Sequence, residues 1–283
     1  MKYQNQDVQV SENPQWKQTL QTENEALKKQ GQQVTQGPMD QIDYFERQIA
    51  INEYRIKHDL APNQDYDLWN FVTDVSQLIQ FAGLFTITVA AGIVASEFSW
   101  GTIKLLLIRP LNRSKILLSK YLTVLLFGLL MLVILFSFST LLGTILFGLP
   151  QESAPYLNYY AGKVTEQPMV IHLIIYYFLQ SISMVMLATM AFMISAVFRN
   201  SSLAIGLSLF LMFTGGQITR LIAMKYEWAK YILFANTDLM QYFEGTPMLE
   251  GMTISFSVIM LLLYFCLFLS LAFYVFQKRD VAA

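Results

Sequence analysis

The sequence has little of the side-chain chemistry on which most enzymes depend. Its 283 residues include two histidines and one cysteine, Cys266, so no disulfide can form within the chain. These few imidazole and thiol groups exclude an HExxH motif and a Cys/His metal cluster. No Gly-x-Ser-x-Gly elbow is present either. The sequence therefore indicates no enzyme.

A nucleotide-binding P-loop is also missing. The motif G-x-x-x-x-G-K-[ST] needs a glycine five positions before its Gly-Lys pair. The only such pair is Gly162-Lys163, and Leu157 stands where that glycine would be. Charged residues make up 14% of the chain and the net charge is −1, with no basic, aromatic-interleaved surface for nucleic acid. Residues 1–70 lack an apolar stretch long enough for a cleavable signal peptide.

Long apolar runs, in contrast, are abundant, and 54% of the residues are hydrophobic. A helix crosses the hydrocarbon core in about 20 residues. An open sheet would leave backbone groups unsatisfied in lipid, so we expect helices. The sequence predicts an all-α polytopic membrane protein with five spans, near residues 71–96, 121–147, 169–198, 202–222 and 253–276.

The loops between these runs predict the orientation. The segment 97–120 is strongly basic, which by the positive-inside rule makes it cytoplasmic. Segments 151–167 and 224–252 are then outside, and the C-terminus is inside. Aromatic and charged residues alternate in 224–252, which is typical of short helices lying at the membrane interface.

Residues 1–70 are polar, and the same alternation places them outside. A helical pattern runs from Met39 to about His58, and a second follows Pro14, so we expect an extracytoplasmic helical hairpin ahead of a transmembrane domain at 71–283. An outside N-terminus without a preceding span is unusual. We therefore expect a sixth, N-terminal helix upstream of Met1 in the functional protein.

Polar and small residues inside the spans are the remaining candidates for function or packing. Thr88, Gly92 and Ser96 repeat at four-residue spacing, as do Ala191 and Ser195, and such faces let helices approach closely, either inside one subunit or across a dimer. Intramembrane polar groups mark candidate translocation paths, with packing between helices as the alternative. The candidates are Gln180, Gln217 and Arg220.

The basic segment carries a family resemblance. Glu97, Gly101-Thr102, a leucine run, Arg109-Pro110, Arg113 and Lys120 resemble the first cytoplasmic loop of bacterial ABC-2-type permeases, the membrane subunits of ATP-binding-cassette transporters. A second stretch, 228–238, agrees with this family. The resemblance covers roughly residues 50–283.

The resemblance implies an exporter subunit in the bacterial cell membrane that works with a separate cytoplasmic ABC ATPase. That partner would carry the ATP and Mg²⁺, and this chain would hold no cofactor. A second permease subunit, identical or different, and membrane lipid would complete the assembly. Residues 100–107 would form the coupling helix. The implied ATPase-coupling residues are Glu97, Trp100, Gly101, Thr102, Lys104, Leu106, Leu107, Arg109, Pro110 and Arg113.

Two other functions remain open at this point. A secondary transporter or channel would need no ATPase, and it predicts charges at mid-membrane or broken helices related by a repeat. A membrane sensor or immunity protein would bind a peptide through residues 1–70 and transport nothing.

Overall fold

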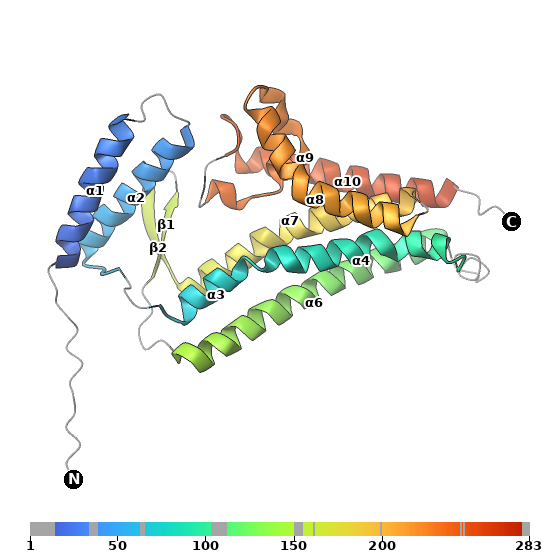
Figure 1. Ribbon diagram of the computed structural model, residues 1–283, viewed down its shortest axis with the longest axis horizontal. Coiled ribbons are helices and arrows are strands. Elements are labelled where there is room, and N and C mark those ends of the chain that lie inside the picture. Colours follow the sequence, from blue (N-terminus) through green and yellow to red (C-terminus); the bar gives the residue numbers. More distant parts are fainter. Residues whose placement is uncertain are drawn as a thin grey trace, which may run out of the picture. The chain divides into compact units, whose positions relative to one another are not determined.

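The computed structural model describes residues 15–33, 39–62, 66–102, 112–149, 155–160, 162–198, 200–243, 245 and 247–278 (Figure 1). The chain divides into two compact units. The smaller unit combines Met1–Asp65 with Ala154–Gln167, and the larger combines Tyr66–Ser153 with Pro168–Ala283.

In the smaller unit two helices and a strand pair come together. Helices α1 (Gln15–Gln33) and α2 (Met39–His58) pack on each other, and the buried Asn52 Nδ2 donates to Asn24 Oδ1 across 2.9 Å. Helix α2 occupies the segment where the sequence predicts a helix.

The strand pair is an element that the all-α prediction does not contain. Strands β1 (Tyr156–Tyr160) and β2 (Lys163–Gln167) are antiparallel, and Gly162 between them has φ 77°. The Tyr54 hydroxyl of α2 donates to Glu166 Oε1 at 3.1 Å. Five-residue strands carry a weak sequence signal, and this contact joins residues more than a hundred positions apart, so local patterns could not predict it.

The larger unit holds the predicted spans. Within the described residues, five helices are long and apolar enough to cross a membrane, which confirms the predicted all-helical architecture. The first comprises α3 (Leu68–Ser76) and α4 (Ile79–Ser99), and the others are α6 (Arg113–Phe147), α7 (Met169–Val197), α8 (Ser201–Ala223) and α10 (Ile254–Lys278).

The first span is broken, whereas the sequence predicts one continuous helix over 71–96. The backbone N–H of Gln77 donates to Asp74 O at 3.2 Å, and that of Leu78 donates to Val75 O at 2.9 Å. These bonds reach back three residues rather than four, so the helix tightens into a 3₁₀ turn between α3 and α4 (Figure 1). Apolar periodicity continues through the turn, which is why the sequence does not reveal it.

The core of the bundle forms where α4 packs on α7 and α8. Ala91 and Ala95 are fully buried, and so is Ala191 on the facing helix. The backbone N–H groups of Val94 and Ala95 both donate to Ser195 Oγ, at 3.2 and 3.0 Å. Such a bond requires the two helices to approach closely, which small side chains allow.

This contact contains one of the two predicted small-residue faces. Ala191 and Ser195 lie in the α4–α7 contact, as expected, but Thr88, Gly92 and Ser96 are only half-buried. The face of α4 that meets α7 carries Ala91 and Ala95, each one position before a residue of the predicted repeat. Since one residue rotates a helix by about 100°, the predicted repeat points away from the closest approach.

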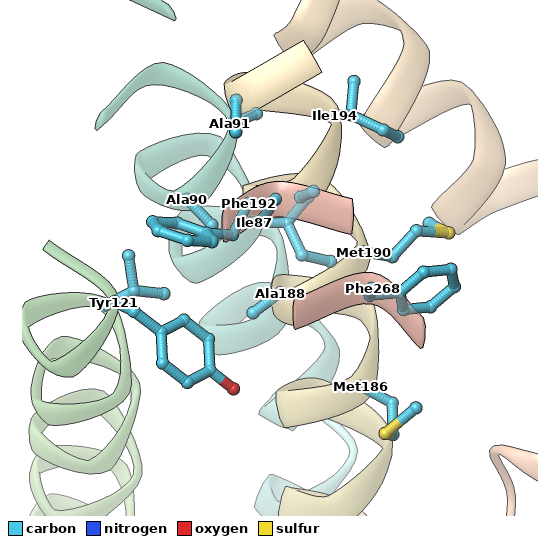
Figure 2. Packing of buried hydrophobic residues seen from close by; sticks show 14 of the residues in the cluster. Ile87, Ala90, Ala91, Tyr121, Met186, Ala188, Met190, Phe192, Ile194 and Phe268 are labelled. Atoms are coloured by element: carbon cyan, nitrogen blue, oxygen red, sulfur yellow. The ribbon is translucent and has the colours of Figure 1, made fainter. Parts of the chain in front are cut away.

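Larger side chains fill the space beside this contact. Figure 2 shows Phe192 beside Ala90, with Tyr121 of α6 and Phe268 of α10 on either side of α7. The Tyr121 hydroxyl is hydrogen-bonded to Thr189 Oγ1 at 2.8 Å, so a buried polar group has its partner.

The segment between α8 and α10 packs into the bundle. It contains η1 (Glu227–Tyr231), α9 (Leu233–Asn236) and η2 (Met240–Tyr242). Asn236 is fully buried; its amide donates to Lys230 O at 2.8 Å and Ile232 O at 2.9 Å, and its Oδ1 accepts from Ser257 of α10 at 2.7 Å. The sequence predicts interfacial helices here, but this polar network ties one side of the segment to α10.

Candidate functional site

A cavity of about 480 Å³ lies among α4, α7, α8 and the α9 segment. Cavities of roughly 300–1,000 Å³ are typical of small-molecule sites. The wall is mixed, with aliphatic and aromatic side chains interrupted by amides, hydroxyls and one carboxylate. Its lining residues are Ile79, Gln80, Gly83, Ile87, Gln180, Ser183, Met184, Leu187, Met212, Phe213, Gly216, Gln217, Phe234, Thr237 and Asp238.

Three spans each contribute a glutamine to this cavity, at similar depth. Gln80 lies 19 residues before the end of α4 at Ser99, Gln180 lies 17 before the end of α7, and Gln217 lies 16 after the start of α8. These ends share one side of the bundle, because the Ser201 N–H bonds to Ser99 Oγ at 3.3 Å. At 1.5 Å per residue the amides sit about 24–29 Å from that side. The three helices thus place glutamine amides, which are unfavourable in a membrane without partners, at one level of the bundle.

The single carboxylate of the wall belongs to Asp238, just after α9. Its Oδ1 accepts the Met240 N–H at 3.0 Å. The Asp238 residue lines the cavity and is exposed, and desolvation by the protein around it raises the pKa of its carboxyl. The Met240 and Gln241 N–H groups and the positive charge of Arg220 act in the opposite direction on that pKa. Asp238 is therefore a carboxylate whose charge depends strongly on its surroundings.

Two features give the cavity its shape. Its α4 wall begins at Ile79, directly after the break in the first span. On α8, a Cβ added to Gly216 would meet nothing within 4 Å, so this glycine leaves open space. Gly215, next to it, receives the Phe234 ring, which occupies the space that a Cβ on this residue would need. The ring is thereby fixed against α8.

The far end of α4 is held by an ion pair at the base of the basic loop. Lys120 Nζ donates to Glu97 Oε1 at 2.9 Å and to Ile93 O at 2.8 Å. The Thr102 hydroxyl donates to the other oxygen of Glu97. The Glu97 side chain thus joins α4, the first loop residues and α6.

Of the other predicted coupling residues, three are described by the structure and five lie outside the described residues. Trp100 is 77% exposed at the end of α4, and Gly101 has φ 74°, which suits a turn. Arg113 Nη1 donates to Gln277 O of α10 at 3.3 Å, so this guanidinium has a partner within the chain. Five predicted coupling residues, Lys104, Leu106, Leu107, Arg109 and Pro110, lie outside the described residues.

The three predicted path residues do not all meet. Gln180 and Gln217 line the cavity. Arg220 is exposed, one turn of α8 beyond Gln217, and it acts on Asp238 through its charge. Among the described residues no ion pair within 4 Å joins Arg220 to Asp238.

Sequence reasoning missed Gln80 and Asp238 as site residues. The similar spacings of Gln80, Gln180 and Gln217 from the ends of their apolar runs, 16 to 19 residues, were a usable signal for a shared level. No comparable signal marks Asp238, because it belongs to a segment outside the spans. Within the described part of the chain, no group of three or more His, Cys, Asp or Glu residues could hold a metal ion.

Two relatives are similar to this chain over most of its length. The chain is 55% identical over 272 residues to "Uncharacterized protein YhcI" of Bacillus subtilis (strain 168), covering 95% of this chain and 86% of that protein. It is 30% identical over 198 residues to "Uncharacterized membrane protein YdbK" of the same organism, covering 69% and 76%. The family described as "Protein of unknown function (DUF2705)" matches residues 43–282. The chain is thus a multi-pass membrane protein that belongs to the DUF2705 family.

Proposed function

We propose that this chain is the membrane-spanning subunit of an exporter driven by a separate ATPase. One observation carries the proposal: α4 lines the polar cavity near its start, through Gln80, Gly83 and Ile87, and its last turn carries Glu97, at the base of the basic loop. A helix is stiff over this length. A partner that moved the loop would therefore move one wall of the cavity.

The working cycle follows from this connection. ATP and Mg²⁺ bind on the partner, whose closure displaces the loop 97–120. The Glu97–Lys120 pair passes that displacement to α4 and α6 together. The cavity then alternates between two accessible states, and the chain itself performs no hydrolysis. We further propose that two membrane subunits assemble with two ATPases in the bacterial cell membrane, with the loop on the cytoplasmic side.

A secondary transporter is the second candidate, because the first span is broken next to the cavity. Broken helices beside a binding site are a feature of such transporters, but there they come in pairs related by an internal repeat. In the other spans, as far as the described residues go, no equivalent interruption occurs. The ATPase-driven function accounts for the basic loop as well, and we favour it.

The test has two parts. The full chain, purified with an affinity tag from its own host, should carry a P-loop ATPase that lacks membrane spans. In vesicles containing both proteins, Leu106→Asp should leave ATP hydrolysis intact but abolish transport, because it places a charge on the apolar face that Ile103, Leu106 and Leu107 would share in the predicted coupling helix.

The matched control is Leu105→Asp, which lies off that face and should transport normally. Substrate movement that needs no ATPase, or unchanged transport by Leu106→Asp, would contradict the proposed function. A fully active complex with a single membrane chain would contradict the dimer.

A further inference from the structure

The charge on the cavity wall indicates what the cavity can bind. Of the described residues that line it, only Asp238 is ionisable. A carboxylate in a cavity wall beside apolar side chains interacts more strongly with an opposite charge than one surrounded by water does. A cation is therefore the complementary ligand, and an anion would be repelled.

The amides of the wall are free to contact such a ligand. Among the hydrogen bonds of the described residues, none involves the side chain of Gln80, Gln180 or Gln217. Gln80 and Gln217 are exposed, and Gln180 is half-buried. Polar groups within a membrane bundle are expensive unless they find partners. Their oxygens can accept hydrogen bonds from a bound cation, or from its water, around the Asp238 carboxylate.

The rest of the wall suits an apolar body. Phe213 and Phe234 stand beside aliphatic side chains, and Phe234 is held against Gly215. Aromatic faces attract organic cations, and the attraction increases when the cation is removed from water. A hydrated metal ion would gain nothing from these rings.

We infer that the cavity binds a small organic cation with an apolar body, whose charge is neutralised by Asp238 and whose body packs between Phe213, Phe234 and the aliphatic wall. The inference names the substrate class of the proposed exporter and in that respect rests on the proposed function. The binding site itself rests on the geometry of α4, α7, α8 and α9.

Arg220 fits this assignment although it is a cation itself. It lies outside the lining, one turn along α8, and its charge favours the ionised form of Asp238. It keeps the carboxylate available while leaving the cavity open for a ligand.

The test uses two ions of the same shape and opposite charge. The full chain in lipid nanodiscs, without the ATPase, is titrated with radiolabelled tetraphenylphosphonium or with tetraphenylborate, and binding to empty nanodiscs is subtracted. Tetraphenylphosphonium should bind saturably and tetraphenylborate should not. Equal saturable binding of both ions, or of neither, would overturn the inference.

Matched variants locate the binding. Asp238→Asn keeps the Oδ1 that accepts the Met240 N–H but removes the charge, and it should weaken tetraphenylphosphonium binding about tenfold or more. Glu227→Gln removes an exposed carboxylate from the same segment and should change nothing. An Asp238→Asn protein that binds as tightly as the parent would refute the site.

A second pair of variants tests the cavity independently of charge. Gly216→Leu extends a side chain into the cavity and should abolish binding. Gly206→Leu, on the same helix and also with open space around the added Cβ, lies outside the lining and should bind normally. Both substitutions raise helix propensity equally, so they differ only in position. Normal binding by Gly216→Leu would overturn the inference.

The outcome for the proposed function is separate. Cation binding without ATP-dependent movement in vesicles would reject the exporter and keep the site. ATP-dependent transport by a chain that binds no tetraphenylphosphonium would reject the cation site and keep the exporter.

Discussion

The ammonium group of Lys120 lies 2.9 Å from Oε1 of Glu97, and this ion pair connects α6 to the end of α4. The two side chains are 14% and 23% exposed, so the pair is largely removed from water. An unpaired charge at such a place is unfavourable, because one partner then keeps its desolvation cost without the attraction.

Lys120→Met should therefore destabilise the protein. It leaves the Glu97 carboxylate with only the Thr102 hydroxyl, and we expect a loss on the order of 1–3 kcal/mol, between the values for exposed and fully buried pairs. Thermal unfolding in nanodiscs measures this loss. Lys28→Met is the control, because Lys28 pairs with Glu53 at 3.1 Å on a surface where both side chains are more than half exposed. An equal shift for both variants would contradict the role of the Glu97–Lys120 pair.

Asn236→Leu should disturb the segment between α8 and α10. The leucine has a similar volume but leaves Lys230 O, Ile232 O and the Ser257 hydroxyl without this partner. Each unsatisfied buried group costs about 1–3 kcal/mol. We expect a lower unfolding temperature and, because Phe234 and Asp238 flank this residue, weaker cation binding. Unchanged stability would show that the segment is held by its apolar contacts alone.

Cation binding should increase with pH. Burial raises the pKa of Asp238, so the carboxyl stays neutral to a higher pH than a solvated aspartate would. Below that pKa the site has no negative charge, and above it the charge is present. Tetraphenylphosphonium affinity should therefore rise as pH increases through the raised pKa. Tyr242 is the neighbouring titratable group, and burial raises the pKa of its phenol further above its ordinary value of 10.0, so it stays neutral over this range. Asp238→Asn should give a flat profile, and a pH-dependent Asp238→Asn protein would exclude this carboxyl as the titrating group.

Arg220→Gln should change cation binding in two opposite ways. Without the guanidinium, repulsion of the ligand falls, and the pKa of Asp238 rises further because a favourable charge is lost. At high pH, where the carboxylate is ionised in either protein, the variant should bind tetraphenylphosphonium more tightly. The midpoint of its pH profile should lie higher than in the parent. Weaker binding at high pH would mean that Arg220 positions Asp238 rather than opposing the ligand.

The sequence by itself determined the membrane class and the number of spans. Runs such as 121–147 and 253–276 are apolar all round, and only a helix satisfies its own backbone in lipid, so composition alone suffices. Gln180 and Gln217 could also be selected from sequence, since a polar group inside a span is conspicuous. The basic loop could be recognised as well, because its positive charges stand between two apolar runs.

Only the tertiary structure decided which of these residues meet. Asp238 faces the cavity because the α9 segment packs into the bundle, and that packing depends on Asn236 and Phe234 finding partners on α10 and α8. The break at Gln77 and the β1–β2 hairpin likewise depend on hydrogen bonds and contacts that no local pattern encodes. Hydropathy specifies which segments leave water, whereas the level and direction of each polar group follow from how the helices pack.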